Sequence, residues 1–63
     1  MKALVVYAYT DYSENKKIKI SNDFEYFCSD NPTTSEILTF EERHRRYPDV
    51  LDTKVINIIK LEN

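Results

Sequence analysis

The segment Glu41–Arg46 brings together the side chains of this chain that are best suited to chemistry. Its sequence, EERHRR, contains two carboxylates, one imidazole and three guanidinium groups. An imidazole can act as a general base and arginines can clamp a phosphate, so one interpretation is the site of a small ribonuclease. However, His44 falls on an apolar stripe with Phe40 and Tyr47, where histidines usually pack. We therefore interpret the arginines as a solvated helix C-terminus and do not expect an enzyme.

Metal, disulfide and cofactor chemistry find little support in the composition. Cys28 is the one cysteine and His44 the one histidine, which is too few for a zinc core or a disulfide. The aspartates are scattered and lack the spacing of a calcium loop. The chain has no glycine, so phosphate-binding loops are missing. We predict no metal and no cofactor, and we expect Cys28 to be partly buried in a protein of the reducing cytoplasm.

The basic residues allow one further interpretation, a nucleic-acid interface. Arginines and lysines from separate segments could form a patch beside tyrosines that stack on bases. The formal net charge is only −2, however, and no RNA-binding motif is present. A small nucleic-acid-binding regulator therefore remains an alternative rather than the leading hypothesis.

Length and hydropathy predict a single small domain over residues 1–63. A fold of this size buries only about 60% of the surface of its unfolded chain, so oligomerisation or a bound partner would add useful stability. The longest apolar run, Ala3–Ala8, is far too short to span a bilayer. We expect neither membrane insertion nor an export signal.

Periodicity in the first half of the chain predicts two strands. Ala3–Tyr12 is rich in β-branched and aromatic residues on both faces, which is typical of a central strand. Asp11–Asn15 has turn composition, and without glycine a longer loop is favoured over a tight turn. Lys16–Ser21 alternates lysines with isoleucines that we expect to point inward, and its parity continues through Tyr26.

The second half predicts a helix and a third strand. Thr33 and Glu36 have capping-box spacing, and Pro48 should end the helix near Arg46 or Tyr47. A return loop over Asp49–Asp52 then leads to a strand over Thr53–Leu61. The expected fold class is α+β: a three-stranded antiparallel sheet in the order 2-1-3, with one helix on one face and ββαβ order.

Such a sheet has two apolar faces, and one helix can cover only one of them. If Leu4, Val6, Ile18 and Ile20 pack under the helix, the face with Val5, Tyr7 and Tyr9 stays uncovered. Either Ile56 and Ile58, or Val55 and Ile59, join that second face. Long loops could fold over it, a second copy of the chain could cover it directly or pair through an edge strand, or another protein could bind there.

In layout the chain resembles the short accessory proteins of bacteriophages. The matching segments are KALVVYAY, KKIKI, SEILTFEERHRRYP and KVINIIKLEN, which form a hydrophobic opening strand, a lysine-rich strand, an acidic-to-basic helix and an aliphatic closing strand. Several such proteins are inhibitors that bind a host enzyme, a toxin or a defence complex stoichiometrically. The resemblance implies that class of function and transfers no site residue.

The leading hypothesis is therefore a non-enzymatic phage-type protein of the host cytoplasm that binds and inhibits, or redirects, a host or defence protein. A homodimer could present two copies of the binding surface. The candidate partner-binding residues are a set on the uncovered face and three arginines as a charged secondary surface: Tyr7, Tyr9, Ile56, Ile58, Arg43, Arg45 and Arg46.

Overall fold

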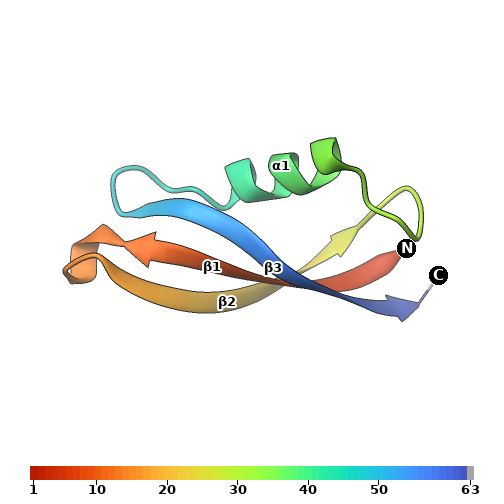
Figure 1. Cartoon of the computed structure of the whole chain (residues 1–63), viewed down its shortest axis with the longest axis horizontal. Helices are drawn as coiled ribbons and strands as arrows, with labels where there is room; N and C mark the ends of the chain where they lie inside the picture. The colour runs from red at the N-terminus through yellow and green to blue at the C-terminus, as the bar shows by residue number, and fades with distance from the viewer. Residues whose placement is uncertain (63) are drawn as a thin grey trace.

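Three long antiparallel strands form the body of the protein, and one helix lies along one side of them (Figure 1). The computed structural model describes residues 1–62. The strand order is β2-β1-β3, which confirms the small α+β fold with ββαβ order. The elements are β1 (Lys2–Asp11), the 3-10 turn η1 (Tyr12–Glu14), β2 (Lys17–Tyr26), α1 (Thr34–Arg43) and β3 (Val50–Glu62).

The connection from β1 to β2 is a longer loop, as the lack of glycine predicts. The Asp11 carboxylate accepts hydrogen bonds from the backbone N–H and the hydroxyl of Ser13, which fixes the start of η1. Asn15 and Lys16 then reverse the chain with φ values of 56° and 57°. Both residues occupy the left-handed region that glycine would adopt at lower cost.

The two outer strands differ in regularity. β1 pairs with β2 without interruption from Lys2↔Tyr26 to Asp11↔Lys17. Its pairing with β3 contains three register shifts, between Lys2 and Ala3, Val6 and Tyr7, and Ala8 and Thr10. β2 is therefore a regular edge, whereas β3 is bulged along its length.

α1 begins as predicted and ends earlier than predicted. The Thr33 hydroxyl accepts from the Glu36 N–H and the Glu36 carboxylate accepts from the Thr33 N–H, which confirms the capping box. The helix ends at Arg43 rather than near Arg46 or Tyr47. Reciprocal hydrogen bonds of 2.8 Å between Arg46 and Val50 draw the chain out of the helix before Pro48.

The predicted return loop over Asp49–Asp52 is also wrong, because β3 already starts at Val50. The same Arg46–Val50 bridge holds the start of this strand. Asp52, with φ of 56°, stays within β3 near the bulge opposite Ala8 and Thr10. Turn-forming residues thus lie inside a strand because a bulge accommodates them.

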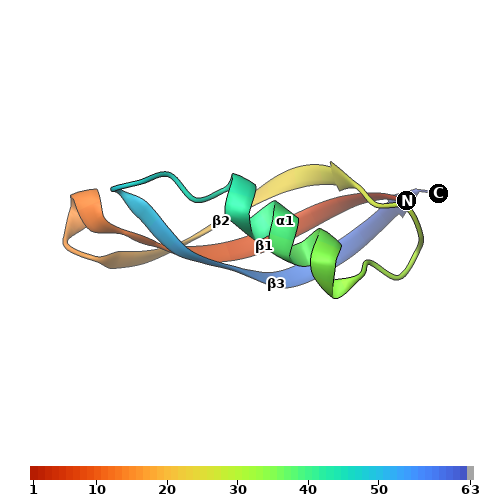
Figure 2. The ribbon, with the colours of Figure 1, turned by 90° about the horizontal axis from the view of Figure 1, so that it is seen from above.

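The core lies between α1 and one face of β1 and β3 (Figure 2). Its buried apolar residues are Ala3, Val5, Phe27 and Phe40, with Tyr7, Val55, Ile58 and Met1 packed around them. The helix therefore covers the Val5 and Tyr7 face, and the expectation that Leu4, Val6, Ile18 and Ile20 pack beneath it is wrong.

Charge explains this choice of face. Directly opposed residues of neighbouring strands share a face, so Asp23 and Glu25, opposite Val5 and Ala3, also lie on the side of the helix. There they contact His44 and Arg43 at the C-terminal end of α1. If α1 covered the other face of the sheet, Arg43 and His44 would be separated from the carboxylates at the end of β2.

The helix present in residues 1–62 does not meet the length and hydropathy that a membrane-spanning helix requires.

Candidate binding surface

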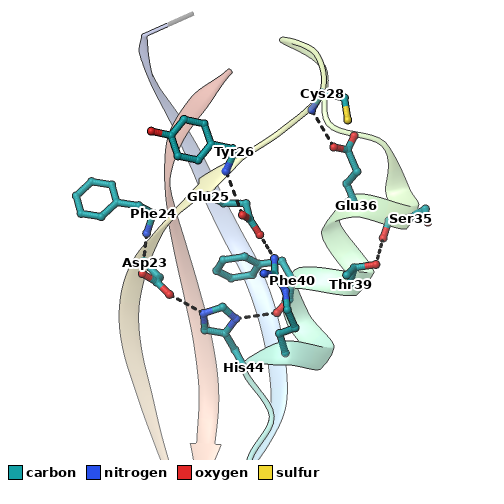
Figure 3. A network of polar contacts seen from close by, with 11 residues as sticks. Asp23, Phe24, Glu25, Tyr26, Cys28, Ser35, Glu36, Thr39, Phe40 and His44 are labelled. Atoms are coloured by element: carbon teal, nitrogen blue, oxygen red, sulfur yellow. Dashed lines mark hydrogen bonds and ion pairs between the residues drawn. The ribbon is translucent and has the colours of Figure 1, made fainter.

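His44 forms the centre of a small polar cluster that joins α1 to β2 (Figure 3). Its Nδ1 lies 2.8 Å from the Phe40 carbonyl oxygen, and its Nε2 lies 2.9 Å from Oδ2 of Asp23. The ring stacks on Phe40 with 4.0 Å between centroids and meets the edge of Tyr7. Because both nitrogens lie within hydrogen-bond distance of oxygen atoms on α1 and β2, the His44 ring holds the end of the helix on the sheet.

The neighbouring carboxylates reinforce this connection. Glu25 forms an ion pair with Arg43, so that arginine is held against the sheet. The hydrogen bond with the His44 ring is the main reason that the pKa of Asp23 lies below its ordinary value, and a hydrogen bond from the Phe24 N–H adds to it. The pKa of Glu36 is lowered chiefly because its carboxylate accepts from the backbone of Thr33 and Cys28.

A shallow hollow of about 240 Å³ lies beside this cluster, between the end of β2 and α1. Its lining is mainly polar and includes Glu25, Glu36, Thr39 and Arg43. Small-molecule sites are usually larger, about 300–1,000 Å³, and mostly apolar. Residues 1–62 also contain no group of three or more His, Cys, Asp or Glu side chains placed to hold a metal ion.

The more prominent feature is the face of the sheet that α1 leaves uncovered. We define this open face by the residues that share it through direct cross-strand pairing: Leu4, Val6, Ile18, Ile20, Phe24 and Ile59. Four of them are exposed, by 74% for Ile18, 68% for Ile20, 61% for Phe24 and 43% for Ile59. Exposed apolar side chains gathered on one face of a sheet are typical of an interaction surface.

The figures show how this surface arises. In Figure 1, α1 lies on one side of the sheet, and none of the segments drawn for residues 1–62 covers the other side. In Figure 3, the rings of Phe24 and Tyr26 point away from α1, whereas the carboxylates of Asp23 and Glu25 point toward it. The ammonium group of Lys2 lies 5.7 Å from the centre of the Phe24 ring and adds a cation to the edge of the face.

The structure does not place the predicted contact residues together on the open face. Tyr7 packs edge-on against Phe40, with 5.6 Å between ring centroids, and Ile58 packs against the core. Tyr9 lies on the helix side, tilted against Tyr7 at 6.1 Å. Ile56 is exposed beside the bulge of β3. The assignment to the uncovered face is wrong for Tyr7, Tyr9 and Ile58, because α1 covers the face of the sheet that we expected to stay open.

The three predicted arginines also separate. Arg43 is paired with Glu25, whereas Arg45 and Arg46 lie exposed in the turn that follows α1. Several lysines have acidic partners as well: Lys19 bonds Asp11 and Glu14, and Lys60 bonds Asp30. Arg43, Lys19 and Lys60 are thus held in ion pairs with acidic side chains, which reduces the number of basic groups that could form one patch.

The expectation that Cys28 is partly buried is wrong, because its side chain is exposed. Phe27 takes the buried position at the end of β2, where its backbone pairs with Met1 through bonds of 2.7 and 2.9 Å. Cys28 therefore falls outside the sheet, and its N–H donates to the Glu36 carboxylate.

Parity along β2 is the signal in the sequence that groups Ile18, Ile20 and Phe24 on one face. Lysines and acidic residues alternate with Ile18, Ile20 and Phe24, so β2 has one charged and one apolar face. Parity does not show which of these two faces the helix covers.

Comparisons find no matching family, curated protein or solved structure for this chain.

Proposed function

We propose that the protein is a non-enzymatic, phage-type binding protein that attaches to a bacterial host or defence protein through its open face and blocks it stoichiometrically. The observation that carries this proposal is the exposure of Ile18, Ile20 and Phe24 on one side of a sheet that has its helix on the other. Burying such side chains releases about 25 cal/mol for each Å² of apolar surface removed from water.

The class of partner is supported by the layout of the chain. The order of strand, strand, helix and strand, with its lysine-rich second strand, resembles small bacteriophage inhibitors. A single exposed cysteine is compatible with action in the reducing host cytoplasm. Occlusion also requires no catalytic group, in agreement with a His44 ring whose two nitrogens are both engaged.

A matched pair of double variants tests the proposal. Ile18→Ser with Phe24→Ser removes two exposed apolar side chains from the open face, whereas Leu38→Ser with Tyr47→Ser removes two that are 48% and 82% exposed elsewhere. Wild-type protein and both variants are used to capture partners from bacterial lysate, and the captured protein is then purified for titration calorimetry and an activity assay.

The expected result is a one-to-one complex that inhibits the partner. Affinity should fall roughly a hundredfold in the open-face variant, because central apolar contacts dominate such interfaces, and should stay near wild type in the control. Circular dichroism checks that both variants fold. Equal affinity of the two folded variants, or a bound partner with unchanged activity, would contradict the proposal.

A further inference from the structure

The outer edge of β2 has the properties of a surface that pairs with a second copy of the chain. Met1 and Phe27 exchange backbone hydrogen bonds of 2.7 and 2.9 Å across β1 and β2. Bonded and non-bonded pairs alternate along an antiparallel ladder, so the odd-numbered residues of β2 bond to β1. The even-numbered residues, from Ile18 to Tyr26, therefore direct their backbone N–H and C=O groups outward.

Two side-chain contacts support this assignment. The Phe24 N–H donates to the Asp23 carboxylate at 2.8 Å, and the Tyr26 N–H donates to the Glu25 carboxylate at 3.0 Å. Neither amide bonds to β1, so both lie on the free edge. A strand from another molecule could replace these two local bonds with backbone carbonyl groups.

Regularity distinguishes this edge from the edge of β3. β2 pairs with β1 over ten residues without a bulge, whereas β3 has three register shifts. Bulges twist an edge and hinder pairing with another chain, while a long regular strand presents a ready template. The edge of β2 is therefore the better partner for strand addition.

The sequence of β2 is complementary to itself in one antiparallel register. In a symmetric pair centred on Ser21, Lys17 would face Glu25 of the second copy and Lys19 would face Asp23. On the other face, Ile18 would face Phe24 and Ile20 would face Asn22. In this register the outward-directed residues oppose one another, which backbone bonding between the two strands requires.

Neighbouring registers match the charges less well. In a register centred on Ile20, Lys17 lies opposite Asp23 and Lys19 lies opposite Ser21. In a register centred on Asn22, Lys19 lies opposite Glu25 and Ser21 lies opposite Asp23. Each retains one type of charge pair, whereas the Ser21-centred register retains two. Opposite charges directly across a ladder stabilise it.

The contacts that Asp23 and Glu25 make within one molecule are compatible with the Ser21-centred dimer. Asp23 also contacts His44, and Glu25 also contacts Arg43, so a lysine from a second copy would share each carboxylate. Lys17 makes no ion pair within residues 1–62. Its exposed ammonium group is therefore available at the position where the second copy would bring Glu25.

We infer that the protein forms a symmetric dimer in which the two β2 strands pair antiparallel about Ser21, giving a continuous six-stranded sheet. The two open faces would then join into one larger apolar surface on the same side. This inference does not rest on the proposed function, since a monomer could bind a partner through its open face equally well.

The solution mass and a cysteine register scan test the dimer. Sedimentation equilibrium of the full chain should give twice the monomer mass of 7.5 kDa. In a Cys28→Ser background, which removes the exposed native thiol, single cysteines are placed at Ile20, Ser21, Asn22 and Val6. Ser21→Cys should form the interchain disulfide fastest under mild oxidation, because a non-bonded cross-strand pair brings Cα atoms to about 4.5 Å.

A charge substitution provides a test that does not depend on cysteine. Lys17→Glu should raise the dimer dissociation constant about tenfold, because it places like charges opposite each other at both symmetric sites. Lys54→Glu makes the same change on β3 and should leave dimerisation unchanged. Both lysines are exposed, so circular dichroism should show folded protein in each case.

Three results would overturn the inference. One is a monomer at millimolar concentration. Another is a dimer that cross-links through Val6→Cys faster than through Ser21→Cys, since that pattern means the open faces are stacked together. The third is equal sensitivity of the dimer to Lys17→Glu and Lys54→Glu. Partner binding by the open face, measured on the monomeric protein, would remain a separate question.

Discussion

At the scale of single residues, buried polar groups connect the helix to the sheet. Glu41 is almost fully buried, and its carboxylate accepts a hydrogen bond of 2.8 Å from the Val55 N–H. The Val55 N–H lies in β3, near the register shift that the pairing of β1 with β3 shows between Val6 and Tyr7. A bulge disturbs the ladder locally, so a side chain from the helix supplies an acceptor at this point.

We expect Glu41→Ala to lower the free energy of unfolding by about 1–3 kcal/mol, because it leaves the Val55 N–H without its acceptor. The neighbouring Glu42 is exposed, and Glu42→Ala should change stability by no more than about 0.5 kcal/mol. Urea denaturation of both variants measures the difference. Equal effects would show that the contact with Val55 contributes nothing measurable.

At the scale of elements, the hairpin between β1 and β2 forms without glycine at some conformational cost. Asn15 tolerates the left-handed region well, since its short polar side chain can bond locally. Lys16, with φ of 57°, has no such advantage. The chain thus retains a strained residue directly before β2, the strand that carries much of the open face.

Lys16→Gly should therefore stabilise the protein by about 0.5–1 kcal/mol, as relief of the left-handed penalty exceeds the added entropy of the unfolded chain. Lys54→Gly, at an exposed position within β3, should instead destabilise it by about 0.5–1 kcal/mol. Thermal unfolding followed by circular dichroism compares the two. A loss of stability in both would show that the hairpin does not strain Lys16.

At the scale of the whole molecule, the protein is long and thin, with extents of 39 × 18 × 13 Å. A helix of ten residues covers part of one face, and the buried apolar set within residues 1–62 is small. Such a chain gains stability when another surface covers its exposed apolar side chains. Both proposed interactions, through the open face and through the edge of β2, would provide this.

Adjacent valines of β1 offer a direct measure of how the two faces differ. Val5→Ala should cost about 2 kcal/mol, because Val5 is completely buried beneath α1. Val6→Ala should cost less than half as much, since Val6 lies on the open face and is only half-buried. Denaturation of both variants at low protein concentration makes the comparison. Equal costs would mean that the open face is already covered in solution.

Much of the fold follows from local patterns that the sequence shows by itself. Alternation and β-branched residues determine the three strands, the Thr33–Glu36 spacing determines the start of α1, and the apolar residues on both sides of β1 determine its central position. These features depend on neighbours a few residues apart, so one amino-acid sequence is sufficient to predict them.

Only the tertiary structure decided which face of the sheet the helix covers, and with it which residues form the open face. Leu4 and Val6 are as apolar as Val5 and Tyr7, so the periodicity of β1 favours neither side. The choice came from contacts between distant segments: Phe40 against Val5 and Tyr7, His44 with Asp23, and Arg43 with Glu25. Because strand side chains alternate, that single choice placed Tyr7, Tyr9 and Ile58 on the helix side of the sheet.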